Sequence, residues 1–324
     1  MSKYLYIFTL FFVANSYSQS FAPAAGESGS TAIHMDSSII VNWGAKVQVE
    51  RGYLDISNPG LGLVDFGDSD FAEGKANGDS FNIVSLGDSG VAIITFQRPI
   101  KNGLGFDFAV FENGFADDYI ELAFVEVSSD GEHFVRFPST SEASTSEQIG
   151  PYSFSDCRFF NNLAGKYRQG YGTPFDLEEL KDSNDIDLMN ITHVKLIDVV
   201  GTINTELGSF DQFGNVINDL YPTPFSSGGF DLDAVAVINE GLLSYESVVY
   251  DNFKIYPNPT KNKIHIKSKG KTSVSIVNLF GCEISEFSFY DEISYSFDVL
   301  PNGIYFVKLK NNNSYKIVKV VVEK

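Results

Sequence analysis

The chain has 324 residues, of which 43% are hydrophobic and 14% aromatic, so it can bury a sizeable core and is long enough for two domains. Its formal net charge of −19 is repelled by phosphate backbones and anionic headgroups, and we expect no binding to nucleic acid. Abundant Phe, Tyr and Gly favour β-structure with tight turns. Cys157 and Cys282 fall in different candidate domains, so we expect two separate thiols.

The first residues have the pattern of a secretory signal peptide. Lys3 precedes an apolar run at 4–14, and small residues at Ser16 and Ser18 suit a cleavage site before Gln19. We therefore expect a signal peptide over residues 1–19. The apolar run is too short for a transmembrane helix, and no other apolar span follows, so we expect no transmembrane segment after cleavage.

Short strands separated by turn signals follow from residue 20 to residue 240. We expect strands at 39–41, 45–49, 82–86, 91–96, 103–111, 120–127, 133–137, 193–200 and 230–239, and a short helix at 176–180. This spacing favours a sandwich or jelly roll. The predicted fold class is all-β, with a large jelly-roll-like β-sandwich as the cargo domain at 20–240.

The stretch from Gly103 to Phe115 marks the centre of this domain. Aromatic residues alternate with small or acidic ones as far as Glu112, and the Asn-Gly pair that follows is a strong turn signal. The run at 119–127 also has the character of a strand. We expect the two runs to lie side by side at the centre of a sheet, with carboxylates inside it.

The charge of the chain changes sign near Tyr250. Residues 251–324 contain eleven Lys and seven Asp and Glu, which gives them a net charge of +4. Because the whole chain has a net charge of −19, residues 1–250 have a net charge of −23. This asymmetry predicts a linker at 241–252 and a separate domain at 253–324. Alternating residues predict strands at 263–267, 273–277, 303–309 and 315–322, and a small β-sandwich.

The last domain resembles the C-terminal sorting domains of the type IX secretion system. The similarity rests on Phe253–Thr260, Val274–Gly281, Leu300–Lys308 and Lys316–Lys319, in that order and spacing. The resemblance implies handling by the type IX secretion machinery and export across an outer membrane. It also implies removal of the domain, followed by attachment to the cell surface or release. The expected location is therefore secreted or on the outer cell surface.

The central domain resembles a family of secreted bacterial cell surface proteins that is related to jelly-roll binding modules. The segments that carry the resemblance are Gly105–Gly114, Leu122–Gly131, Leu163–Lys166, Gly172–Asp176, His193–Val199 and Gly229–Ala234. Distant relatives of this family include corrinoid-binding surface proteins. None of their ligand residues can be mapped onto this chain.

No pattern in the sequence predicts a catalytic residue. The four histidines, His34, His133, His193 and His265, lack partners at metal-ligand spacing, and we expect structural or solvated roles for them. There is no Gly-x-Ser-x-Gly motif, and Cys157 has no papain-like context. A triad assembled from distant residues stays open, because a single sequence does not reveal it.

Carboxylates inside apolar strands give the strongest chemical signal. A buried carboxylate is costly unless it is paired, hydrogen-bonded or bound to a metal. Hard oxygen ligands suit calcium, which makes a calcium site one interpretation. The alternative is that the strand faces are solvated or that the carboxylates bind loop amides. The candidate metal ligands are Glu112, Glu126, Asp198, Asp231 and Asp233. Because side chains alternate between the two faces of a strand, Asp231 and Asp233 should lie on the same face. The oxygen-rich loop at 211–219 is a second candidate, with a plain turn as its alternative.

Two long loops are candidates for the rim of a binding site. Their candidate ligand-binding residues are Tyr167, Arg168, Tyr171 and Tyr221. We expect a non-catalytic, exported binding protein whose ligand is a small extracellular molecule such as a glycan. The alternatives are a polysaccharide hydrolase that uses two carboxylates, a structural or adhesive surface protein, and a corrinoid-binding surface protein.

Overall fold

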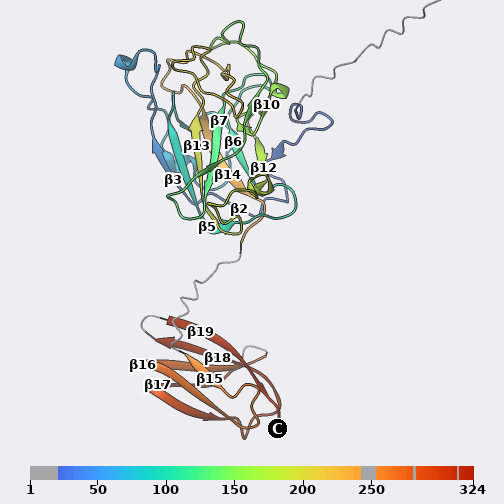
Figure 1. The fold of residues 1–324 in the computed structure, drawn as a ribbon, viewed down its shortest axis with the longest axis vertical. Helices are drawn as coiled ribbons and strands as arrows, with labels where there is room; N and C mark the ends of the chain where they lie inside the picture. The colour runs from blue at the N-terminus through green and yellow to red at the C-terminus, as the bar shows by residue number, and fades with distance from the viewer. Residues whose placement is uncertain (1–20, 242–252, 280–281, 312–313) are drawn as a thin grey trace, which may run out of the picture. The chain divides into compact units, whose positions relative to one another are not determined.

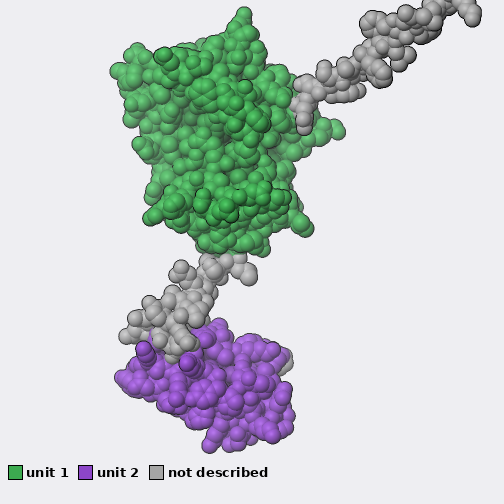
Figure 2. Space-filling model, in the orientation of Figure 1, with its two compact units in different colours: residues 1–242 green, residues 243–324 purple. Residues whose placement is uncertain are grey.

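The computed structural model describes residues 21–241, 253–279, 282–311 and 314–324, which divide into two compact units at 1–242 and 243–324 (Figure 2). The predicted signal peptide at 1–19 lies outside the described residues, as does the predicted linker at 241–252 apart from Gly241. The described residues contain strands and short 3-10 helices but no α-helix, which confirms the all-β fold class. No helix among them is long and apolar enough to cross a membrane. Cys157 and Cys282 are both free thiols, as predicted.

The first unit contains two large antiparallel sheets (Figure 1). The first sheet runs in the order β1 (Ile33–His34), β12 (Tyr171–Phe175), β6 (Phe108–Glu112), β14 (Asp231–Val237) and β2 (Asn42–Trp43), and β4 (Val84–Ser85) also pairs with β14. The second runs in the order β11 (Leu163–Ala164), β7 (Ala123–Ser128), β13 (Ile191–Asp198), β5 (Val91–Ile100) and β3 (Lys46–Glu50), and β8 (Val135–Arg136) also pairs with β7. A separate pair is formed by β9 (Thr140–Ser141) and β10 (Phe160–Asn161).

Four short 3-10 helices lie in the connections of this unit. They are η1 (Pro59–Leu61), η2 (Ser69–Ala72), η3 (Cys157–Phe159) and η4 (Leu177–Leu180). The last of these is the helix predicted at 176–180, where Asp176 caps the turn by accepting from the N–H of Glu178.

The main core lies between the two sheets and follows from the alternation of side chains along each strand. Phe108 and Val110 of β6 point into it from the first sheet, and Val125 of β7 and Leu196 of β13 point into it from the second. The residues between them point outwards, but they are buried as well, because loops cover the outer faces. This explains why β6, β7 and β14 are buried along their whole length.

The prediction that β6 and β7 lie side by side in one sheet is wrong. β6 pairs with β12 and β14, whereas β7 pairs with β13, β11 and β8 in the other sheet. The Asn113-Gly114 pair therefore begins a crossing between the sheets and not a hairpin. This crossing, residues 113–122, is called the crossing loop below.

β6 and β13 end where β7 and β14 begin, and this edge is called the loop end of the sandwich. The register pairs Asp198 with Ala123 and Leu232 with Glu112. Antiparallel pairing therefore brings the carboxylates at these strand termini to one end. The crossing loop and the long connection at 199–230 join the strands there.

The second unit is one curled five-stranded sheet (Figure 1). Its strands are β15 (Lys254–Tyr256), β16 (Lys263–Asn278), β17 (Glu283–Ser296), β18 (Gly303–Asn311) and β19 (Ser314–Val322). The strands predicted at 263–267 and 273–277 are parts of β16, whose register with β17 shifts between Lys267 and Lys271. The sheet has its own core, which includes Phe297 and Val307.

Candidate functional site

Five buried carboxylates influence one another at the loop end of the sandwich. They are called the carboxylate cluster, and they are Glu112, Glu121, Asp198, Asp219 and Asp231. Each is at most 7% exposed. Glu112 is the last residue of β6, Asp198 is the last residue of β13, and Asp231 is the first residue of β14. Glu121 lies in the crossing loop, and Asp219 lies in the 199–230 connection.

Two members of the cluster are anchored by backbone amides. Asp219 accepts hydrogen bonds from the N–H groups of Leu122 at 2.8 Å and Leu220 at 2.7 Å. Asp198 accepts from Phe230 at 2.7 Å and Ser89 at 3.2 Å. Both oxygens of each carboxylate therefore have a donor, and these side chains fix the connections around the cluster.

Glu112 and Asp231 are less completely satisfied. Glu112 Oε2 accepts from the N–H of Gly114 at 2.7 Å, but Glu112 Oε1 has no hydrogen-bond partner. Asp231 accepts from the hydroxyl of Ser85, and the nearby side chain of Asn113 stabilises its charged form. The amide oxygen of Asn113 is also buried without a partner.

Burial raises the pKa of every carboxylate in the cluster. Loss of water raises the pKa of Glu112 and Glu121 well above its usual range, and the neighbouring charge of Asp231 raises both further. Burial likewise raises the pKa of Asp219 and of Asp231 to about 7. No ion pair between described residues includes a member of the cluster. The cluster therefore needs protons or a bound cation to offset its charge.

The structure brings together three of the five predicted metal ligands. Glu112, Asp198 and Asp231 belong to the cluster, whereas Glu126 is paired with Arg136 at 2.8 Å and Lys195 at 2.5 Å.

Asp233 lies near Asp231 in the sequence but has different partners. It accepts from the N–H groups of Asn77 at 2.8 Å and Gly78 at 2.9 Å. A register shift between Leu232 and Ala234 interrupts the alternation of side chains, which explains why Asp233 does not share the environment of Asp231.

Glu121 and Asn113 were missed as site residues by the sequence analysis. Glu121 falls inside the strand predicted at 120–127, whereas β7 begins only at Ala123, and Asn113 was assigned to a turn. Asp219 was covered only as the end of the candidate loop at 211–219. The start of that loop is a turn, in which Asp211 accepts from the N–H groups of Phe213 and Asn215 at 2.9 Å each.

A groove of about 860 Å³ lies beside the crossing loop. Its lining mixes carboxylates, hydroxyls and aromatic rings: Ala24, Glu27, Ala116, Asp117, Asp118, Ala143, Ser144, Ser146, Glu147, Ile149, Phe154, Ser155, Asp156, Cys157, Arg158 and Phe159. The Phe154 ring is 66% exposed and that of Phe159 is 40% exposed. Asp156 and Arg158 form an ion pair at 2.7 Å, and this pairing lowers the pKa of Asp156.

The crossing loop connects the groove to the carboxylate cluster. Its ends carry Glu112, Asn113 and Glu121, and its middle lines the groove. The N–H of Ser155 donates to the carbonyl of Asp118 at 2.7 Å and fixes the middle of the loop against the opposite wall. The position of that wall therefore depends on how the two ends of the loop are held.

The predicted ligand-binding residues lie around this region in different environments. Tyr167 is 2% exposed and its hydroxyl contacts Thr31 at 2.8 Å. Tyr221 is 8% exposed and donates to Asp55 at 2.8 Å.

The other two predicted ligand residues form a surface pair. The guanidinium of Arg168 lies over the ring of Tyr171, 4.8 Å from its centroid. Arg168 also pairs with Asp117, which lines the groove.

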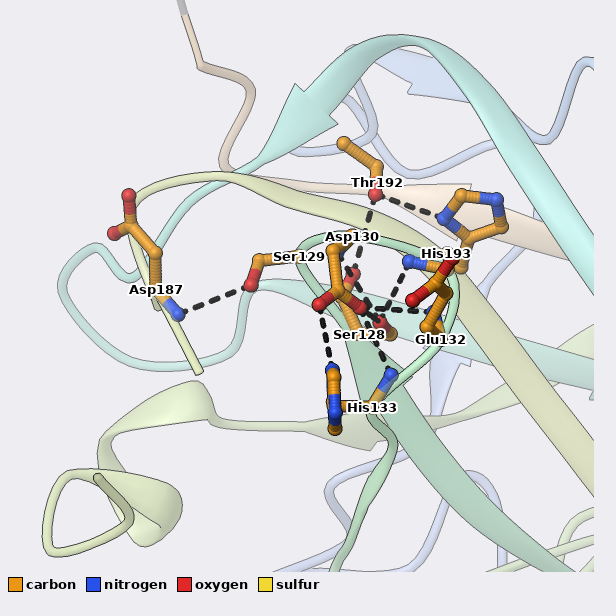
Figure 3. Close-up of polar contacts among 9 residues, drawn as sticks. Ser128, Ser129, Asp130, Glu132, His133, Asp187, Thr192 and His193 are labelled. Atoms are coloured by element: carbon orange, nitrogen blue, oxygen red, sulfur yellow. Dashed lines mark hydrogen bonds and ion pairs between the residues drawn. The ribbon is translucent and has the colours of Figure 1, made fainter. Parts of the chain in front are cut away.

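At the opposite end of β7 a polar turn contains His133, and His193 of β13 lies beside this turn (Figure 3). Asp130 accepts from the N–H groups of Glu132 at 2.8 Å and His133 at 2.9 Å, and its other oxygen contacts His133 Nδ1 at 2.8 Å. His193 Nδ1 contacts the Thr192 hydroxyl at 2.8 Å. These contacts stabilise a hairpin turn.

Comparison with known proteins identifies the second unit. Residues 254–323 match the family model described as "Secretion system C-terminal sorting domain". No curated protein matches the chain.

Solved structures resemble the chain only weakly. β-Glucuronidase from Ruminococcus gnavus is 10% identical, with a TM-score of 0.21, and the match covers 95% of this chain and 48% of that enzyme. β-Glucuronidase from Parabacteroides merdae is also 10% identical, with a TM-score of 0.21, and the match covers 95% of this chain and 37% of that enzyme. The BSP domain of a biofilm associated protein is 10% identical, with a TM-score of 0.19 and coverages of 87% and 52%. The chain therefore spans about half or less of these proteins, and the likeness says nothing about its activity.

A sorting domain of this kind implies handling by the type IX secretion machinery. The chain is therefore a substrate of that machinery. The chain is a protein with a C-terminal sorting domain at residues 254–323, exported by a type IX secretion system to the cell surface or the exterior.

Proposed function

We propose that the exported unit is a non-catalytic binding protein and that its ligand is a glycan held in the groove beside the crossing loop. The observation that carries this proposal is the lining of the groove, where two exposed phenylalanine rings lie among carboxylates and hydroxyls. Aromatic faces stack on the apolar faces of sugar rings, and carboxylates and hydroxyls accept or donate hydrogen bonds to sugar hydroxyls. A groove that is open to solvent also suits an extended polymer.

Binding is favoured over hydrolysis by the position of the acids. A glycosidase needs a carboxylic acid with a raised pKa in contact with the scissile bond. The carboxylates of the cluster have raised pKa values, but they are buried below the surface. In the groove itself, pairing with Arg158 lowers the pKa of Asp156, which makes it a poor proton donor.

The proposal is tested by incubating the purified protein with an array of polysaccharides and following both binding and the release of reducing ends. Saturable binding of a glycan without release of reducing ends supports it. Release of reducing ends that stops on substitution of a groove carboxylate, such as Glu147→Gln, establishes a hydrolase instead. Binding of no glycan overturns the proposal and leaves a structural or adhesive surface role.

A further inference from the structure

Two buried oxygen atoms at the loop end of the sandwich have no hydrogen-bond donor. Glu112 is 1% exposed and Asn113 is 3% exposed, and the unpartnered atoms are Glu112 Oε1 and Asn113 Oδ1. Both side chains lie at the carboxylate cluster, because Glu112 pairs in register with Leu232, the neighbour of Asp231, and Asn113 directly follows Glu112. A buried acceptor without a donor is costly and rare in folded proteins, so two of them together point to a missing electropositive partner.

The charge at the same place points to a cation. Glu112, Glu121 and Asp231 are all buried acidic side chains, and no ion pair between described residues includes any of them. Arg51 is the cation whose charge reaches Asp231, but its N–H groups donate to backbone carbonyls, among them that of Phe66 at 2.8 Å. Within the described parts of the chain, no cationic side chain therefore forms an ion pair with these carboxylates.

We propose that this part of the cluster is a calcium site, in which Glu112, Asn113 and Asp231 supply oxygen ligands and Glu121 contributes balancing charge. Calcium binds six to eight oxygen atoms and accepts carboxylates, side-chain amides, backbone carbonyls and water in flexible geometry. The unpartnered oxygens of Glu112 and Asn113 are ligands of this kind. Zinc is disfavoured because it takes nitrogen and sulfur ligands in structural sites.

The ligand set needs more than acidic side chains. No group of three or more His, Cys, Asp or Glu residues in the described parts of the chain is arranged to hold a metal ion by itself. The proposed set has two ligating carboxylates and one amide oxygen, and backbone carbonyls and water complete it. Magnesium fits less well, because it demands a near-ideal octahedron and gives up its water reluctantly.

The proposed ion acts on the crossing loop. Glu112 and Asn113 are at one end of this loop and Glu121 is near the other, so an ion between them fixes both ends relative to β14. This role does not depend on the identity of the ligand in the groove. Calcium binding is therefore measurable even if the groove binds no glycan.

The test uses the purified protein after treatment with a chelator. We expect calorimetric titration with CaCl₂ to give one bound ion per chain, and the melting temperature to rise by about 5–10 °C at about 100 times the Kd. Glu112→Gln and Asp231→Asn should abolish this rise. Asp233→Asn is the matched control, because Asp233 is a buried carboxylate on the same strand whose partners are loop amides, and it should retain calcium binding.

Comparing the melting temperatures of Glu112→Gln and the original protein, without and with calcium, separates loss of the calcium site from a general loss of stability. Without calcium, Glu112→Gln removes a buried acid whose ionised form has no counter-ion, so the variant should melt at the same temperature as the original protein or higher. With calcium the order should reverse. An absence of binding heat and of any calcium-dependent change in melting temperature overturns the proposal, as does calcium stabilisation of Glu112→Gln equal to that of the original protein.

Discussion

The side-chain amide of Gln148 donates to Asn218 Oδ1 at 3.1 Å, and this contact joins a wall of the groove to the connection that carries Asp219. Asn218 is fully buried and donates in turn to the carbonyls of Ser144 and Glu147 at 2.7 Å each. Its Oδ1 also accepts from the N–H of Ile149 at 3.0 Å. One amide therefore holds the loop at 144–149 in place.

Asn218→Ala should destabilise the first unit by about 2–4 kcal/mol, because it leaves several buried donors and acceptors without partners. Urea denaturation measures this loss. Gln212→Ala is the control in the same connection, since Gln212 is exposed and makes a single contact with Thr140 at 3.1 Å. Equal stabilities of the two variants would show that Asn218 does not fasten the loop.

Phe154→Ala should weaken glycan binding about tenfold, because an exposed ring in the groove loses its stacking contact with a sugar. The melting temperature should stay unchanged, since the ring is 66% exposed. Calorimetric titration with the bound glycan measures the affinity. Phe81→Ala removes a ring that is 78% exposed outside the groove and should leave the affinity intact. A similar loss in both variants would remove the assignment of the groove.

Lys166 gives the first unit a pH dependence at alkaline pH. The side chain is 4% exposed, and its ammonium donates to the carbonyl of Phe160 at 2.8 Å. Burial lowers the pKa of Lys166 from 10.5 to about 8. Between these two values the unfolded chain binds more protons than the folded one, so the lysine's contribution to stability rises with pH.

At lower pH the Lys166→Met variant should gain stability relative to the original protein, because it buries no charged amine. This relative gain should disappear as the pH rises from 8 to 10.5. The difference in unfolding free energy between the original protein and the variant should change by up to about 3 kcal/mol in favour of the original. Urea denaturation at pH 7.5 and pH 10 measures it. Parallel pH profiles of the two proteins would mean that the amine is not desolvated.

His133 and His193 should titrate on opposite sides of pH 6.5 (Figure 3). The hydrogen bond and charge of Asp130 raise the pKa of His133, whereas burial lowers the pKa of His193. Titration followed by NMR of the imidazole protons measures both. Asp130→Asn should lower the pKa of His133; an unchanged value would contradict the pairing.

Strand alternation and turn residues predicted the all-β fold and most strands of the first unit. They singled out Glu112, Asp198 and Asp231 but left open whether these carboxylates are solvated or buried. The path of the crossing loop was not predictable, because an Asn-Gly pair favours a hairpin and carries no information about which sheet the next strand joins. The separation of Asp233 from Asp231 depends on a register shift that period-two reasoning does not contain. Glu121 and Asn113 enter the cluster only through that loop path.

The groove was not predicted from the sequence, and none of the four predicted ligand-binding residues lines it. Its walls come from segments far apart in the chain, such as Glu27, Asp118 and Phe154, and no short pattern joins them. The aromatic residues singled out in the sequence are largely interior, because Tyr167 and Tyr221 are held by hydroxyl contacts beneath the surface.

The central claim is that the exported unit binds a glycan in the groove beside the crossing loop. The most direct test is a crystal structure of the protein with the glycan that the array selects. We predict sugar rings stacked against Phe154 or Phe159, with hydrogen bonds to the groove carboxylates. Sugar bound at another surface, with the groove occupied only by water, would contradict the account.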